Sequence, residues 1–207
     1  MCASYGLQVV DDFTSLDERL ATPDLVDWLR ARAGQDFGTT RKDGRPLSPI
    51  ITAAGVEDAW WWLWVKGAPA KATAFNARSE RLTESPLWRG PFRSRRVLIP
   101  ATHYFERANQ PGVKGRFRFS HPEAALLTIA GIAAPTAPDA GPATSFAMVT
   151  RAPAAPGAGI HDRMPLIVPR AFQLEWLDPE RRGDQGLIEA AVAASEELSA
   201  QLVVEPA

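Results

Sequence analysis

The chain has 207 residues, of which 45% are hydrophobic and 23% are charged, and its formal net charge is −1. This composition is typical of a globular protein and excludes a disordered chain, and no apolar run is long enough to span a bilayer. The single cysteine, Cys2, excludes a disulfide framework, and the start of the chain has no readable signal peptide, so we expect one cytoplasmic domain over residues 1–207 that does not bind a membrane.

The first third of the chain predicts one helix and two strands. A Thr-Pro-Asp run at 22–24 is typical of a helix start, and Gly34 marks the expected end of that helix. Residues 35–46 have the composition of a loop. The segments 47–52 (LSPIIT) and 59–65 (AWWWLWV) are expected to be strands, the second with alternate tryptophans on one face.

The rest of the chain adds more strands and two helices. Strands are predicted at 96–100, 103–108, 115–121, 125–132 and 145–150. The second and third of these flank a Pro-Gly turn and favour a hairpin, whereas 134–143 is expected to be a surface loop. Helices are predicted at 170–177 and 186–198, and an edge strand at 201–204. Because strands and helices do not alternate regularly, we expect an α+β fold with a mixed, mainly antiparallel sheet or a barrel-like core and peripheral helices.

The near-neutral total hides an uneven distribution of charge. Residues 76–118 carry 10 basic and 3 acidic groups, which gives +7, and nine of the ten cations are arginine. Residues 171–207 carry 2 basic and 8 acidic groups, which gives −6. On charge alone, a solvated arginine-rich face balanced by the acidic ends is the favoured explanation of the basic segment. A site for DNA or RNA needs only one local patch, and guanidinium groups bind phosphate oxygens in pairs, so the near-neutral total does not exclude it.

Few residues suggest chemistry. The three histidines and the cysteine are not spaced as metal ligands, and the chain has no Gly-rich phosphate loop, so we expect no metal and no cofactor. Four polar stretches remain: Met-Cys at 1–2, FNARSE at 75–80, YFE at 104–106 and IHDRMP at 160–165. Each stretch has a structural explanation by itself, as a turn, a solvent-facing strand residue or a capped loop.

Together, these stretches resemble the SRAP family (SOS response-associated peptidase), whose members process abasic sites in DNA. The resemblance implies a single α+β domain with a DNA-binding cleft, and an active site made of Cys2, Asn76, Glu106 and His161. This sequence departs from the family pattern after Cys2, where Ala3-Ser4 replaces the usual Gly-Arg, and after Glu106, where Arg107 replaces the usual tryptophan.

The chemistry of an N-terminal cysteine agrees with this resemblance. Removal of Met1 would expose an amine and a thiol on adjacent carbons, which is the arrangement that closes a thiazolidine ring on the aldehyde of an abasic nucleotide. We expect Glu106 and His161 to move protons and Asn76 to position the reacting groups.

The expected partner is single-stranded DNA that contains abasic sites. Arg78 and Arg163 lie beside catalytic positions and are expected to bind the flanking phosphates. We expect a monomer that acts in the DNA-damage (SOS) response. A cysteine-dependent peptidase and a non-catalytic single-stranded DNA binder are the alternatives.

Overall fold

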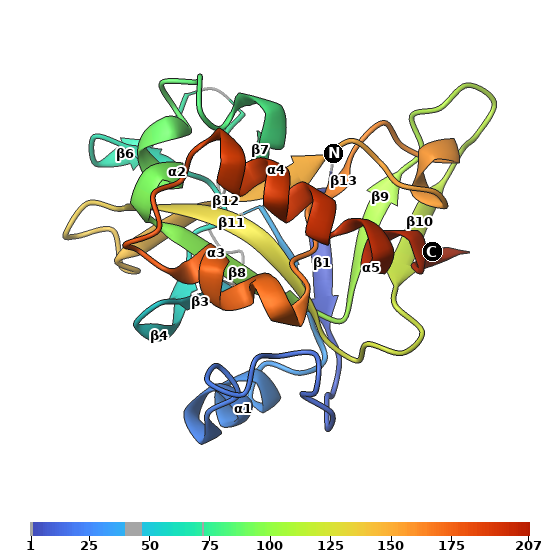
Figure 1. Cartoon of the computed structure of the whole chain (residues 1–207), viewed down its shortest axis with the longest axis horizontal. Helices are drawn as coiled ribbons and strands as arrows, with labels where there is room; N and C mark the ends of the chain where they lie inside the picture. The colour runs from blue at the N-terminus through green and yellow to red at the C-terminus, as the bar shows by residue number, and fades with distance from the viewer. Residues whose placement is uncertain (1, 40–46, 72) are drawn as a thin grey trace.

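The computed structural model describes residues 2–39, 47–71 and 73–207, and it has the predicted α+β fold with mostly antiparallel sheets (Figure 1). Two sheets, of five and seven strands, contain nearly all of the strands, and a two-stranded ribbon completes the set. Among the described residues, no helix is both long enough and apolar enough to cross a membrane.

The seven-stranded sheet forms the centre of the core. Its main path runs β13-β12-β11-β8-β3-β4, and β7 pairs with β12 in parallel. The central strands read as continuous apolar runs because both of their faces are covered. The strands of this seven-stranded sheet are β3 (Ser48–Thr52), β4 (Gly55–Ala59), β7 (Asn76–Arg78), β8 (Arg96–Ala101), β11 (Leu127–Pro135), β12 (Thr144–Arg151) and β13 (Met164–Pro165).

The five-stranded sheet has the order β14-β10-β9-β1-β2 and brings the start of the chain next to its middle. Strand β1 pairs with β9 so that Tyr5 lies opposite Tyr104, and β9 and β10 form the predicted hairpin. Its members are β1 (Ser4–Leu7), β2 (Gln35–Gly38), β9 (His103–Arg107), β10 (Arg116–Ser120) and β14 (Val203–Pro206). The remaining two-stranded ribbon is β5 (Trp64–Val65) with β6 (Ala68–Pro69).

The helices are short and lie outside the sheets (Figure 1). Helix α1 begins as predicted: Pro23 occupies its first turn, and the Thr22 side chain accepts a hydrogen bond from the backbone N–H of Leu25. The α-helices are α1 (Pro23–Arg30), α2 (Arg89–Ser94), α3 (Gln173–Leu177), α4 (Gln185–Ala194) and α5 (Glu196–Ala200), with 3₁₀ turns at Ser79–Arg81, Gly157–Gly159 and Arg170–Phe172.

Three local predictions are corrected by the structure. Residues 35–38 form strand β2, so the predicted loop 35–46 is wrong at its start, and its residues 40–46 lie outside the described part of the chain. The predicted strand 59–65 breaks up: Trp61 is fully buried and its indole N–H donates to the carbonyl of Phe75, so tertiary packing overrides the alternation. The predicted helix 186–198 divides into α4 and α5 at Ser195.

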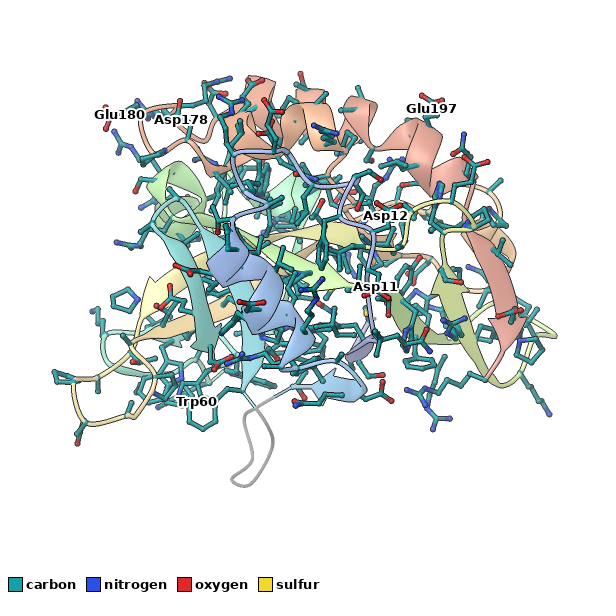
Figure 2. The ribbon with its side chains drawn as sticks, turned by 90° about the horizontal axis from the view of Figure 1, so that it is seen from below. Asp11, Asp12, Trp60, Asp178, Glu180 and Glu197 are labelled. Carbon is teal, nitrogen blue, oxygen red and sulfur yellow. The ribbon has the colours of Figure 1, made fainter. Side chains whose placement is uncertain are left out.

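The acidic ends of the chain lie on the outside. Figure 2 shows Asp11 and Asp12 on the N-terminal segment, and Asp178, Glu180 and Glu197 around the C-terminal helices at the upper margin of the view. All five of these residues are exposed, so their carboxylates face solvent.

Candidate active site

Cys2 is the first described residue of the chain, and it is fully buried. Its Sγ lies 3.5 Å from the carbonyl oxygen of Ser4. The Asn76 side chain donates a hydrogen bond of 2.6 Å from Nδ2 to the Cys2 carbonyl. Asn76 begins β7, and the pairing of β7 with β12 fixes its position. Asn76 therefore positions the residue that would carry the reactive amine, while Met1 lies outside the described residues.

Glu106 is a buried carboxyl group beside Cys2. Its side chain is 2% exposed, because residues alternate along β9 and Tyr104 and Glu106 face inward. Burial raises the pKa of Glu106 to about 7, against the opposing effect of a hydrogen bond from the Cys2 backbone. Burial also raises the pKa of the Cys2 thiol well above its ordinary value, and the charge of Glu106 raises it further. The two groups thus influence one another, and Glu106 is poised to gain or lose a proton near neutral pH.

His161 lies on the other side of this carboxyl group. Its Nε2 is 3.8 Å from Oε2 of Glu106. Nδ1 lies 2.9 Å from the backbone nitrogen of Arg163, 3.1 Å from a carboxylate oxygen of Asp162 and 3.2 Å from the carbonyl oxygen of Arg163. Burial lowers the pKa of His161, so the ring is neutral near pH 7. A neutral imidazole beside Glu106 can accept a proton from that carboxyl group and pass it on within the site.

The two predicted phosphate contacts differ in their surroundings. Arg78 is exposed at the end of β7, two residues from Asn76. Arg163 is 8% exposed, and its guanidinium donates two hydrogen bonds of 2.8 and 2.9 Å to the carboxylate of Glu80 and one of 2.6 Å to the carbonyl of Thr150. In this structure Arg163 therefore anchors the His161 loop to the end of β7, and only Arg78 presents its charge to solvent.

A cavity of about 360 Å³ leads from the surface to Glu106 and His161. Its walls include three residues that sequence reasoning did not select: Ser4, Asn109 and Arg116. Asn109 fixes the loop after His161, because its Nδ2 donates to the Asp162 carboxylate at 2.6 Å and its Oδ1 accepts from the Asp162 backbone N–H. Glu80, the partner of Arg163, ends the FNARSE stretch but was not selected as a site residue. Ser4, Asn109 and Arg116 act through contacts between distant segments, so no local motif could identify them.

The structure brings the four predicted catalytic residues into one place. Cys2 contacts Asn76, and Glu106 lies between Cys2 and His161. Within the described residues, no group of three His, Cys, Asp or Glu side chains is arranged to hold a metal ion. The arrangement therefore offers a titrating carboxyl group and a neutral imidazole in the wall of one cavity, with the Cys2 thiol and the Asn76 amide buried next to them.

Curated relatives match the chain over part of its length. The abasic site processing protein YoqW of Bacillus subtilis is 32% identical over 119 residues, which cover 56% of this chain and 53% of the relative. The abasic site processing protein YoaM of the same organism is also 32% identical over 119 residues, covering 56% and 52%. The chain thus matches about half the length of these relatives.

Solved structures match nearly the whole chain. A protein from Bacteroides thetaiotaomicron superposes with a TM-score of 0.72 at 20% identity, covering 99% of this chain and 91% of the other. A phage-related protein from Bordetella bronchiseptica superposes with a TM-score of 0.66 at 19% identity, covering 100% and 94%. At these identities the likeness establishes a shared fold.

A family model described as SOS response associated peptidase (SRAP) matches residues 30–206. The matched range contains Asn76, Glu106 and His161, and Cys2 precedes it. The resemblance inferred from the motifs is thereby confirmed, and the chain belongs to the SRAP family.

Proposed function

We propose that this protein processes abasic sites in single-stranded DNA by forming a covalent thiazolidine link between Cys2 and the abasic sugar. The observation that carries the proposal is the placement of Cys2 between the amide of Asn76 and the buried carboxyl group of Glu106. The Bacillus subtilis relatives are named abasic site processing proteins, which supports the same substrate.

The proposed reaction needs the mature N-terminus, from which Met1 has been removed. The Cys2 amine attacks the C1′ aldehyde of the ring-opened sugar, and loss of one water gives an imine. The thiol then adds across the C=N bond: sulfur bonds to C1′, and the thiol proton is transferred to nitrogen. The product is a five-membered ring, and the overall reaction releases one water.

The site residues fit these proton transfers. Glu106, with a pKa of about 7, accepts a proton from the amine and returns it to the departing hydroxyl group, and it accepts the thiol proton during ring closure. His161, whose Nε2 lies 3.8 Å from Glu106, relays a proton from that carboxyl group to the sugar oxygen when the ring opens. Asn76 holds the Cys2 carbonyl and thereby orients both the amine and the thiol.

The proposed DNA contacts are at the edge of this site. Exposed Arg78 is placed to bind a phosphate near the abasic nucleotide. Phosphate binding by Arg163 stays a prediction, since its guanidinium is occupied by Glu80 in this structure. The role in the SOS response also stays a prediction.

The test is a covalent protein–DNA band on a denaturing gel after incubation with an oligonucleotide that contains one abasic site. The band should appear without borohydride, because a thiazolidine, unlike an imine, does not need reduction to survive. Cys2→Ala should abolish it. Cys2→Ser should give a band only with borohydride, because the amine remains but ring closure is weak. Intact mass should show that Met1 has been lost.

The alternatives predict other outcomes of the same experiment. A non-catalytic binder would retain the oligonucleotide without a covalent band, and a peptidase would cleave a peptide with no dependence on the abasic site. An unmodified abasic oligonucleotide, incubated with protein that has lost Met1, would falsify the crosslinking proposal.

A further inference from the structure

Two arginines lie directly opposite one another at the open end of the β9–β10 hairpin. In the register of this pair, Arg107 faces Arg116, so their side chains emerge on the same side of the sheet. Like charges in opposed positions destabilise a sheet. Among the described residues, neither arginine forms an ion pair with a carboxylate, so this repulsion has no visible compensation in the protein itself.

Arg116 is held in place by neutral neighbours. Its guanidinium carbon lies 3.6 Å from the centre of the Phe105 ring, and its Nη2 donates a hydrogen bond of 3.0 Å to the hydroxyl of Ser4. Both contacts orient the guanidinium without neutralising it. A positioned cation with unused N–H groups is suited to bind an anion.

The same cavity connects these arginines to the proposed active site. Arg107, Arg116, Phe105 and Ser4 line it together with Glu106 and His161. Ser4 is two residues from Cys2, so the Arg116 guanidinium contacts the segment that carries the reactive residue. Residue alternation along β9 points Arg107 and the inward-facing Glu106 to opposite faces of the sheet. An anion bound between the two arginines would therefore share the cavity with Glu106 and His161 while lying on the other side of β9 from the Glu106 side chain.

Arg118 provides an internal comparison. It lies on β10 two residues after Arg116, on the same side of the sheet, and its Nη1 is 3.3 Å from a carboxylate oxygen of Glu205. It does not line the cavity. The two arginines thus share a strand, a face and a charge, but within the described part of the chain Arg118 has an acidic partner and Arg116 has none.

We propose that Arg107 and Arg116 form a binding site for a phosphodiester group next to the abasic nucleotide, with Arg116 as the main contact. The inference rests on the proposed function for the identity of the strand. The site would fix the position of the sugar relative to Cys2, so that the same phosphate contact would contribute to DNA binding and to the reaction. Free phosphate esters have the same chemistry and are the alternative ligand.

The experiment separates phosphate binding from covalent reaction. The probe is a single-stranded oligonucleotide with one tetrahydrofuran abasic analogue, which has no aldehyde and cannot crosslink. Arg116→Met should weaken its binding about tenfold or more and reduce the log–log salt slope by about 0.7, the value for one lost phosphate contact on a single strand. Arg118→Met is the matched control and should change binding far less. Arg116→Lys should give an intermediate affinity, because it keeps the charge but loses the planar fork.

A second probe locates the contact. Replacing one flanking linkage by an uncharged methylphosphonate, on either side of the analogue in turn, should weaken binding of the wild-type protein at one side only. The same replacement should have little further effect on Arg116→Met, because the contact is already lost. Thermal unfolding of each variant shows whether it is folded. If Arg116→Met does not fold, the binding measurements on Arg116→Lys test the proposal instead.

The outcomes distinguish the two proposals. Equal binding by Arg116→Met and Arg118→Met, or an equal methylphosphonate effect in wild type and Arg116→Met, overturns the phosphate site. Loss of deoxyribose 5-phosphate binding in Arg116→Met with unchanged oligonucleotide binding shows a small-ester site and also overturns it. If the expected binding pattern appears but a natural abasic site gives no covalent band, the phosphate site stands and the proposed reaction fails.

Discussion

Replacing Glu106 by glutamine tests whether ionisation of this buried carboxyl group lowers the stability of the folded protein. Glu106→Gln keeps the size of a side chain that is 2% exposed and removes its ability to ionise. Burial raises the pKa of this group in the folded protein from 4.5 to about 7. Between these values the folded state therefore binds more protons than the unfolded state, and the free energy of unfolding falls as pH rises, then levels off above about pH 7. At about 1.36 kcal/mol for each pH unit, the wild-type protein loses about 3 kcal/mol across this window.

The assay is urea unfolding of wild type and variant at several values between about pH 4 and about pH 8. The difference in unfolding free energy, variant minus wild type, should rise by about 3 kcal/mol toward the alkaline end. Glu123→Gln is the control: it replaces an exposed carboxylate and should give a flat difference. A flat difference for Glu106→Gln would show that folding does not raise the pKa of this carboxyl group, and a falling difference would show that the folded protein stabilises its charged form. In either case the proposed proton-transfer role would lose its basis. The same variant should slow crosslinking by about 10²–10⁴-fold.

Four further changes probe the surroundings. Asn76→Ala should slow crosslinking, measured on gels as the rate of band formation, because the Cys2 carbonyl loses its 2.6 Å hydrogen bond. Glu80→Gln should lower the free energy of unfolding by about 1–2 kcal/mol in urea titrations, because it leaves the buried Arg163 guanidinium without its carboxylate; equal stability would argue against the anchor. Alkylation of Cys2 by iodoacetamide at neutral pH should be much slower in folded than in urea-unfolded protein, by mass spectrometry, since burial raises the pKa of the thiol. Thr22→Ala should cost about 1 kcal/mol by removing the cap of α1, and an unchanged urea midpoint would contradict it.

The sequence predicts the parts of this molecule that depend on local pattern. The hairpin of β9 and β10, the helix that begins after Thr22 and the edge strand at the C-terminus each have a signal within about ten residues, and all three form. The run of tryptophans at 60–64 has strand-like composition, but Trp61 is buried in the aromatic core against Tyr5 and Phe146. Packing between distant segments determines the conformation of residues 60–64, and no local sequence pattern predicts this packing.

The site divides in the same way. Cys2, Asn76, Glu106 and His161 were selected through motifs, and the structure brings them together, with Glu106 and His161 in the wall of the cavity. The motifs could not indicate which charged side chains form ion pairs within the folded protein. Arg163 lies two residues after His161, but its guanidinium is bound to Glu80. Arg116 belongs to no motif, yet it reaches Ser4 across 112 positions of sequence. Pairing of charges is a property of the tertiary structure, and it changes which arginines remain available for the proposed DNA contacts.

The protonation state of the Cys2 thiol also helps to distinguish a peptidase from a crosslinking protein. A cysteine peptidase attacks with a thiolate, and its cysteine usually lies in an electropositive environment that lowers the thiol pKa. Cys2 has the opposite environment: it is fully buried, and the nearby Glu106 carboxyl group raises its pKa further. Ring closure on an imine makes a weaker demand, because the electrophile is already attached to the adjacent nitrogen and Glu106 can accept the thiol proton as sulfur bonds to carbon. The surroundings of the thiol therefore favour a reaction in which the amine attacks first and the sulfur follows.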